Sequence, residues 1–161
     1  MINWTTFTRA VAISAKPELI YNAWTHSREL EKWFLRKAGF IRPDEPITDQ
    51  IIAKSGDSYE WNWHLYEPME KGKVIEANGK DLFRFSFAGN CEVAISLSTM
   101  HGMTLVKLVQ SNIPTDEESM EKIRLGCDTG WSFYLVNLKS IYEGGIDLRN
   151  KDVKFRGMLD H

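Results

Sequence analysis

A change in hydrophobic period near Thr115 is the feature that most constrains how this chain can fold. Before it, apolar and polar residues alternate in several short segments, as in half-buried β-strands. After it, from Thr115 to Glu143, apolar residues recur at the spacing of one helical face. One long helix must then cover the apolar faces of all the strands. The pattern therefore predicts an α+β fold in which a curved antiparallel sheet wraps around a C-terminal helix.

The amino-terminal part of the chain predicts one strand followed by two short helices. Residues 5–14 alternate as a strand does. Pro17 suits the first turn of a helix that ends near Trp24, because that position needs no N–H donor. Ser27 is positioned to cap the second short helix. No regular element is predicted between Gly39 and Pro46.

Turn signals separate the strands and bound the long helix. Asn78–Gly79 is the strongest short signal for a β-hairpin. Over residues 103–111 both faces are partly apolar, so the inner face is not assigned. Thr115 is expected to cap the long helix, and Gly144–Gly145 to end it. Alternation over residues 57–68 predicts a strand whose inner face carries Tyr59, Trp61, Trp63 and Leu65.

Length and charge exclude several classes of protein. The 161 residues predict one domain spanning residues 1–161. The formal charge of −2, with acids and bases interleaved, argues against a nucleic-acid partner. No apolar run approaches the ~20 residues that span a bilayer, and residues 1–11 lack the pattern of a secretion signal. Cys91 and Cys127 lie in apolar patterns, which predicts reduced, buried thiols in a cytoplasmic protein.

Three stretches resemble a known family. They are "PELIYNAWT" with "ELEKWF", "GMTLVKLVQS" and "GWSFYLVNLKSIYEGGIDLR". They are similar to the bacterial single-domain homologues of the activator of the ninety-kilodalton heat-shock chaperone's ATPase, within the START-like (SRPBCC, helix-grip) group. The resemblance covers nearly the whole chain. It implies a helix-grip fold with a hydrophobic cavity, and it makes a chaperone a candidate partner.

The chaperone-activating motif of that family has no clear counterpart here. In the eukaryotic co-chaperone, an Asn- and Trp-rich stimulatory motif lies in a separate amino-terminal domain. "WNWH" at Trp61–His64 looks superficially like this motif. It lies within an alternating strand, where both tryptophans should point inward and His64 outward. We therefore interpret it as part of the core.

Aromatic residues on the inner faces are the main candidates for a binding site. They have two interpretations, ordinary core packing or the wall of a ligand cavity, and the sequence leaves both open. Buried Trp N–H and Tyr O–H groups would give an apolar cavity a few polar contacts. Leu138 lies on the same helical stripe. The candidate set is Trp61, Trp63, Phe83, Phe85, Trp131, Tyr134 and Leu138.

Arg9 completes the set of candidate ligand-binding residues. It shares strand parity with Phe7 and Val11, so it could face the interior. An inward guanidinium would hold a carboxylate or phosphate head group. The alternative is a solvated or snorkelling arginine at the strand end. The same two alternatives apply to Arg124 on the helix.

No catalytic or metal-binding motif accompanies these residues. The four histidines are scattered without HExxH spacing and no CxxC occurs, so neither a metal nor another cofactor is expected. No nucleophile elbow, phosphate loop or dinucleotide fingerprint is present. Acid–base catalysis would need two carboxylates to converge in a cavity. Those at Glu60, Glu67, Glu76 and Glu92 fall mostly on outward positions.

Phe133 and Val136 lie off the helical stripe, where they could contact the C-terminal segment "IDLRNKDVKF" or form a homodimer surface. The function predicted from the sequence is non-catalytic binding of a small hydrophobic or amphipathic molecule between sheet and helix. The alternative is a protein-binding regulator that acts on a chaperone. A third hypothesis is an enzyme of the cyclase or hydrolase kind.

Overall fold

The structure, a computed structural model, describes residues 1–45 and 51–160 and contains one seven-stranded sheet. The strand order is β1-β7-β6-β5-β4-β3-β2, and every neighbouring pair is antiparallel. The strands are β1 (Phe7–Ile13), β2 (Lys37–Ile41), β3 (Ser58–Asn62), β4 (Glu70–Ala77), β5 (Leu82–Phe87), β6 (Cys91–Met100) and β7 (Met103–Ser111).

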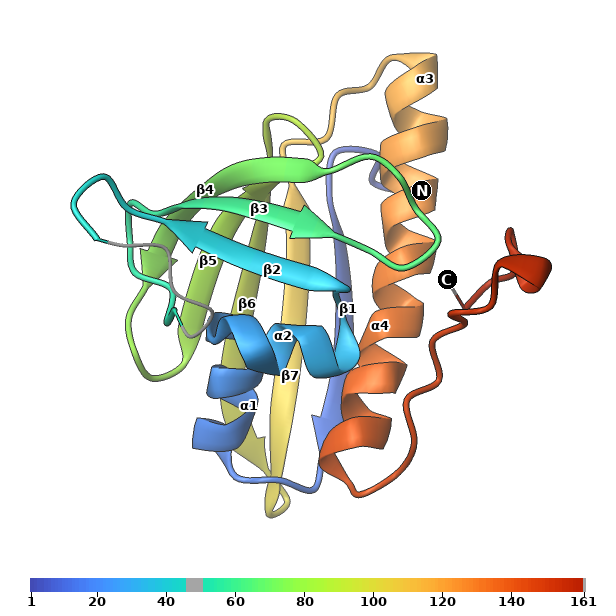
Figure 1. Ribbon diagram of the computed structural model, residues 1–161. Coiled ribbons are helices and arrows are strands. Elements are labelled where there is room, and N and C mark those ends of the chain that lie inside the picture. The colour runs from blue at the N-terminus through green and yellow to red at the C-terminus, as the bar shows by residue number, and fades with distance from the viewer. Residues whose placement is uncertain (46–50, 161) are drawn as a thin grey trace.

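A long continuous helix runs along the sheet, and two short helices cover one end of it (Figure 1). The helical elements are α1 (Pro17–Thr25), α2 (Ser27–Trp33), α3 (Glu117–Ser119), η1 (Met120–Leu125), α4 (Gly126–Tyr142) and the 3-10 turn η2 (Val153–Phe155). This order and packing confirm the predicted α+β helix-grip fold. No helix in the described parts of the chain is long and apolar enough to cross a bilayer.

The prediction of an irregular segment after Gly39 was wrong, because strand β2 occupies part of it. Ala38 and Phe40 are buried, and Phe40 lies opposite Tyr59 of β3. Five residues that include a glycine are too few to show the alternation that identifies a strand. The end of that predicted segment, Pro46, lies outside the described residues.

The strand predicted over residues 57–68 is shorter than expected. Strand β3 ends at Asn62, and the chain then turns, with Leu65 at a φ of 59°. Trp63 and His64 therefore lie in the β3–β4 loop, and His64 is half-buried there instead of on an outer strand face. The hairpin predicted at Asn78 is confirmed, since β4 and β5 pair on either side of it.

Helix capping also differs from the expectations. Ser27 lies inside α2, where its hydroxyl donates to the Ile51 carbonyl, and the N-cap position is His26. The long helix is capped by Asp116 and not by Thr115, because the Asp116 carboxylate accepts a hydrogen bond from the Ser119 N–H. Gly144 follows the helix with a φ of 81°, which agrees with the predicted end.

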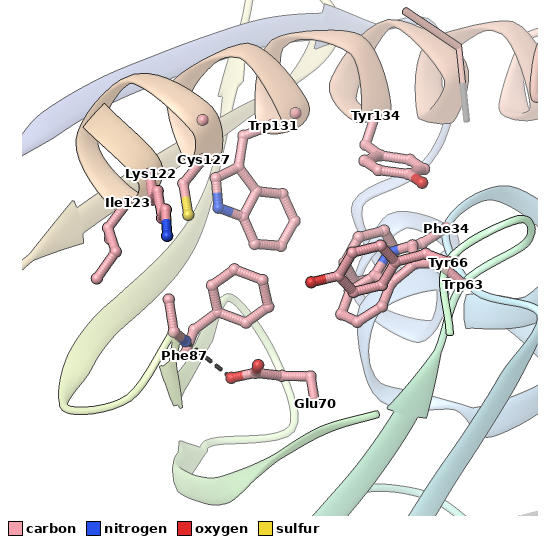
Figure 2. Close-up of a pocket in the computed structure, with 13 residues that line it drawn as sticks. Phe34, Trp63, Tyr66, Glu70, Phe87, Lys122, Ile123, Cys127, Trp131 and Tyr134 are labelled. Carbon is pink, nitrogen blue, oxygen red and sulfur yellow. Dashed lines mark hydrogen bonds between the residues drawn. The ribbon is translucent and has the colours of Figure 1, made fainter. Parts of the chain in front are cut away.

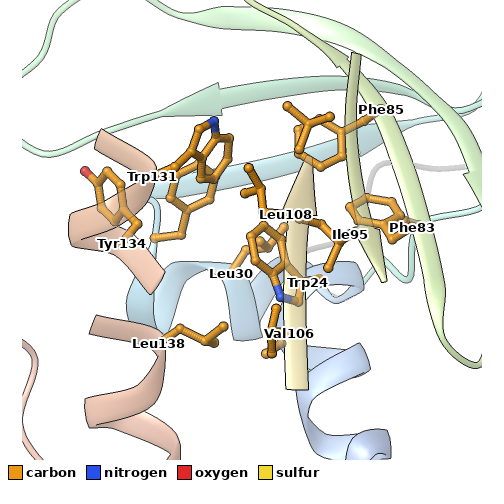
Figure 3. Packing of buried hydrophobic residues seen from close by; sticks show 14 of the residues in the cluster. Trp24, Leu30, Phe83, Phe85, Ile95, Val106, Leu108, Trp131, Tyr134 and Leu138 are labelled. Atoms are coloured by element: carbon orange, nitrogen blue, oxygen red, sulfur yellow. The ribbon is translucent and has the colours of Figure 1, made fainter. Parts of the chain in front are cut away.

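The core lies between the concave face of the sheet, the short helices and the second half of the long helix (Figure 3). Its largest fully buried side chains include Trp24, Trp33 and Trp61. The inner face of β7, which the sequence left unassigned, carries Thr104, Val106, Leu108 and Gln110. Aromatic side chains bury ~150–250 Å² each, so they supply much of the apolar area removed from water.

The segment after the long helix is tied to α2 by a buried arginine. Arg149 is 7% exposed, and its guanidinium donates to the carbonyl oxygens of Glu31, Lys32 and Leu35. These carbonyls lie at the C-terminal end of α2, where a helix leaves such groups without partners. Asp147 pairs with Arg149 at 2.8 Å. The arginine thus ties the C-terminal segment to α2 and to the residues just after it.

Candidate ligand-binding pocket

A pocket of about 330 Å³ lies between the first half of the long helix and the end of the sheet formed by the β3–β4 loop, the start of β4 and the end of β5 (Figure 2). This volume is at the lower end of the ~300–1,000 Å³ typical of small-molecule sites. Most of the wall is apolar. The lining residues are Phe34, Trp63, Tyr66, Glu70, Phe87, Ala88, Lys122, Ile123, Gly126, Cys127, Gly130, Trp131 and Tyr134.

Small residues on the helix leave the room that the pocket occupies. Gly126 and Gly130 are four residues apart and therefore share one helical face. Both line the pocket beside Cys127. A Cβ built on Gly130 would meet no atom within 4 Å, so a side chain at this position would enter open space. A glycine inside a helix costs ~1 kcal/mol relative to alanine. Here the missing side chains leave the space that the pocket occupies.

Aromatic rings form the rest of the wall. Phe34, at the end of α2, is the centre of the group. Its ring centroid lies 5.4 Å from that of Trp63, 5.1 Å from that of Trp131 and 4.9 Å from that of Tyr134. Phe87 packs 5.1 Å from Trp131. The indole N–H of Trp131 donates to the Gln110 side chain at 2.9 Å, which fixes the ring but leaves this donor unavailable to a ligand.

Glu70 brings a carboxylate to this apolar wall. It is the first residue of β4 and shares the inner face of that strand with Gly72 and Val74. One carboxylate oxygen accepts a hydrogen bond from the Ala88 N–H at 2.8 Å. Burial raises the pKa of Glu70, and the hydrogen bond from Ala88 only partly opposes this shift. Glu70 is the sole carboxylate among the residues that line the pocket.

The other titratable side chains at the pocket are poorly suited to catalysis. Burial raises the pKa of the Cys127 thiol to about 11, so the nucleophilic thiolate is scarce at neutral pH. Burial likewise raises the pKa of Tyr134. Lys122 lies at the rim, where its side chain is 70% exposed and bound to Glu118 at 2.8 Å. In residues 1–45 and 51–160, no group of three His, Cys, Asp or Glu side chains could hold a metal ion.

The structure brings three of the predicted site residues to the pocket. These are Trp63, Trp131 and Tyr134. Four of the others lie in the core behind the pocket, and each is at most 1% exposed: Trp61, Phe83, Phe85 and Leu138. Trp131 and Tyr134 belong to the core cluster and also line the pocket, so for these two residues core packing and a place in the pocket wall coincide.

Arg9 does not line the pocket. Its side chain is 44% exposed, pairs with Asp128 at 2.6 Å and donates to the Ser132 hydroxyl at 3.1 Å. Strand β1 is an edge strand beside α4, so an arginine on it reaches the helix surface. Arg124 also contacts Asp128 and lies over the ring of Phe7. Neither guanidinium is a ligand anchor in this pocket.

Several pocket residues were absent from the predicted set. Phe34 lies just after α2, where periodicity gives no signal. Tyr66 falls within the strand predicted over residues 57–68, on the face opposite to Trp63, and this prediction was wrong because Tyr66 lies in the β3–β4 loop and lines the pocket. Phe87 continues the inner-face alternation of Phe83 and Phe85, so its strand position was readable. Glu70 has the same strand parity as Val74, and this parity was the available signal for an inward carboxylate.

A second, larger depression of about 1050 Å³ lies along α2 and β2. Half of its lining residues are charged, so it differs in character from the aromatic pocket. Four of these are basic, namely Arg28, Lys32, Arg36 and Lys37, and two are acidic, Glu31 and Glu60. The basic excess gives this groove a local positive charge on a chain whose formal charge is −2.

Solved structures share this architecture at low sequence identity. The Aha1 dimer from Colwellia psychrerythraea is 22% identical, with a TM-score of 0.66 over 90% of this chain and 98% of that one. A protein from Staphylococcus saprophyticus is 13% identical, with a TM-score of 0.69 over 89% and 96%. A protein from Chromobacterium violaceum is 21% identical, with a TM-score of 0.62 over 86% and 98%. At these identities the likeness establishes the fold alone.

Sequence comparison assigns the family. No curated protein matches the chain significantly. The model of the family described as "Activator of Hsp90 ATPase homolog 1-like protein" matches residues 14–143, which is most of the chain. The match begins at the end of β1 and ends just after α4, so it includes every element that lines the pocket. The chain therefore belongs to the family of activator of Hsp90 ATPase homolog 1-like proteins.

Proposed function

We propose that this protein binds a small hydrophobic or amphipathic molecule in the pocket between sheet and long helix, without catalysing a reaction. The observation that carries the proposal is the 330 Å³ pocket itself, with its aromatic wall and small helical residues. A glycine face on a helix has a stability cost that a fully packed core would avoid. The lone carboxylate at Glu70 and the protonated thiol of Cys127 do not form an acid–base or nucleophile–base pair, which argues against a cyclase or hydrolase.

Native mass spectrometry of gently purified protein tests this proposal. We expect a mass excess that disappears on denaturation and releases an identifiable small molecule. A Gly130→Leu variant should lose the excess, because its side chain would fill the pocket. Thr129→Leu adds the same side chain at an exposed position on the same helix and outside the pocket, so it should keep the excess. Retention of the molecule by Gly130→Leu would show that it binds elsewhere.

A protein-binding regulator of a chaperone is the second candidate function. It is favoured by the family description, which names an activator of Hsp90 ATPase, and by the basic groove along α2 and β2. Such a groove would attract an acidic surface of a partner. Under this hypothesis, charge reversal at Arg36 and Lys37 should abolish any stimulation of an Hsp90-type ATPase, whereas Gly130→Leu should leave it intact. Equal stimulation by all the variants would exclude the groove.

We also propose that the protein forms a homodimer through the outer side of α4 and the C-terminal segment. The Colwellia psychrerythraea relative is described as a dimer. Val136 is 53% exposed, and Phe155, Met158 and Leu159 are exposed as well, whereas Phe133 packs against the core. Light scattering of the wild-type protein and of Val136→Asp tests the dimer. We expect the substitution to shift the protein towards monomer; a wild-type monomer at high concentration would contradict the proposal.

A further inference from the structure

The unusual feature of the pocket is a carboxylate without a counterion. Within the described residues, Glu70 forms no ion pair, and its hydrogen bond comes from the uncharged Ala88 N–H. The carboxylate lies on the side of the pocket away from the helix, below the rings that fill the centre (Figure 2). A partly buried carboxylate is costly unless it is paired. A bound cation would supply the missing partner.

The one cationic side chain at the pocket does not take this role. Lys122 lies on η1 at the rim, 70% exposed, and its ammonium binds Glu118 one helical turn earlier. This ion pair holds the ammonium at the exposed rim and not beside Glu70. The remaining lining residues other than Glu70 carry no formal charge at neutral pH. Apart from Lys122 at the rim, Glu70 is thus the one side chain of the lining that can bring a charge to the pocket.

The aromatic wall strengthens the preference for a cation. The π-faces of aromatic rings carry negative electrostatic potential, and cages of such rings bind organic ammonium groups. Six rings line this pocket, those of Phe34, Trp63, Tyr66, Phe87, Trp131 and Tyr134. The same rings provide an apolar surface for the body of a ligand. An anion would meet repulsion from both the rings and the carboxylate.

We propose that the pocket binds a small organic ammonium ion, with its N–H groups on the Glu70 carboxylate and its apolar body against Phe34, Phe87 and Trp131. This inference rests on the proposed binding function and names the ligand class. An inward Arg9, one of the two alternatives that the sequence left open, would have held an anionic head group. Arg9 is instead paired with Asp128 outside the pocket.

The inference also carries a pH dependence. An ammonium ion prefers the ionised form of Glu70, whose pKa is raised by burial when the pocket is empty. Affinity should therefore fall as pH drops through that raised pKa, and binding should release a proton where Glu70 is partly protonated. The other ionisable groups that line the pocket or interact electrostatically with Glu70 are Tyr59, Tyr66, Cys91, Lys122, Cys127 and Tyr134.

These neighbouring groups do not produce the same dependence. Burial raises the pKa of Tyr59, Cys91, Cys127 and Tyr134, which keeps them uncharged in mildly acidic and neutral solution. The hydrogen bond to Glu118 raises the pKa of Lys122, which keeps it charged. Loss of affinity in mild acid would therefore report on Glu70.

A charge series with one molecular shape tests the inference on the wild-type protein. The probes are 2-phenylethylammonium, the neutral 2-phenylethanol and the anionic 3-phenylpropionate, each titrated by calorimetry. We expect the ammonium ion to bind at least about tenfold more tightly than the alcohol, and the carboxylate not to bind measurably. Alcohol or carboxylate binding as tight as that of the ammonium ion would overturn the ammonium assignment and leave the proposed binding function standing.

Two variants separate the charge from the cavity. Glu70→Gln keeps an oxygen acceptor for the Ala88 N–H, so the fold should persist. In this variant the affinity for 2-phenylethylammonium should fall to about that for 2-phenylethanol, and the affinity should no longer depend on pH. Gly130→Leu should remove binding of all probes. A different outcome would be that none of the probes binds the wild-type protein and that both variants have its melting temperature and likewise bind no probe. The proposed function would then fail together with this inference.

Discussion

The two halves of the long helix face the same sheet but have opposite roles. The second half, from Trp131 to Tyr142, buries Leu135 and Leu138 in the core, and its buried Trp131 and Tyr134 form the boundary between that core and the pocket. The first half presents the partly exposed Ile123, Cys127 and Gly130 and the exposed Gly126 to a pocket. The helix backbone is continuous, so side-chain size decides between packing and cavity. A single amphipathic stripe thus encodes both a core and a candidate binding site.

The halves also differ in how they are held. In the second half, Asn137 donates to the Trp33 carbonyl at 2.7 Å and accepts from the Leu148 N–H at 2.8 Å, which joins α4 to α2 and to the C-terminal segment. The first half contains the π-helical turn η1 over Met120–Leu125. Such turns occur frequently at functional sites, where they alter the phase of a helix. The packed half is thus fixed by buried polar contacts, and the pocket half departs from ideal helix geometry.

Removal of Arg149 should produce the largest loss of stability. Arg149→Met leaves two carbonyl oxygens of α2, that of Leu35 just after it and the Asp147 carboxylate without their buried donor. We expect the free energy of unfolding to fall by about 3–5 kcal/mol. Urea denaturation measures this difference. A loss below about 1 kcal/mol would mean that the C-terminal segment contributes little to the packing of the second half.

Truncation of core and pocket side chains compares the two halves directly. Leu138 is fully buried, so Leu138→Ala should cost about 2–5 kcal/mol through lost transfer energy and a cavity. Ile123 is only partly buried at a pre-existing cavity, so Ile123→Ala should cost about 1 kcal/mol or less. Thermal unfolding of both variants checks the ranking. Equal losses would contradict the division of the helix into packed and pocket halves.

Asp147 should make the packed half sensitive to acid. Burial would raise the pKa of Asp147, but hydrogen bonds from Arg149 and Lys151 outweigh it and hold the pKa well below its usual range. The resulting stabilisation is present above the unfolded-state pKa of about 3.9 and is lost as pH falls towards the folded-state pKa. We expect Asp147→Asn to lose about 1–3 kcal/mol at neutral pH.

Stability curves of the wild type and Asp147→Asn against pH check this assignment. The difference between them should be constant near neutrality and shrink below about pH 4. A difference that grows in acid would assign the acid sensitivity to another group.

Most of the architecture was predictable because it depends on the spacing at which apolar residues recur along the chain. Alternation in β5 and β6 and the change at Thr115 specified the helix-grip order. The inner faces of Cys91, Val93, Ile95 and Leu97 followed directly from that alternation. Strand β2 was missed because its five residues include a glycine and give too short a pattern. The attachment of the C-terminal segment to α2 was missed because the hydrogen bonds from Arg149 to carbonyl groups distant in the sequence leave no periodic signal.

The candidate site was only partly predictable for a related reason. Trp131 and Tyr134 belong to a periodic stripe, but periodicity cannot tell a core residue from a cavity wall. That distinction depends on what lies opposite, and here it is set by Gly126 and Gly130, which a hydrophobic pattern does not register. Glu70 was missed because the sequence assigned it to no strand, although its strand parity with Val74 places it inside.

The smallest expected effect gives the sharpest test of the comparison, because its sign is opposite to the others. Gly130→Ala restores a better helix former at a position where the added Cβ meets nothing within 4 Å. We expect the free energy of unfolding to rise by about 0.5–1 kcal/mol. The matched control is Gly145→Ala, whose Cβ would lie 2.8 Å from the Ser140 carbonyl oxygen and should therefore destabilise the protein.

A loss of stability in Gly130→Ala would mean that the first half of the helix is packed as tightly as the second, and that the pocket closes in solution. A gain in stability would show that the wild-type sequence has a destabilising glycine at the position that lines the pocket. Alanine fills little of the pocket and leucine much more. Ligand affinity should therefore decline from the wild type to Gly130→Ala and further to Gly130→Leu, while all three proteins stay folded. Measured together, stability and affinity would then move in opposite directions at this one position, which a residue of the ordinary core cannot do.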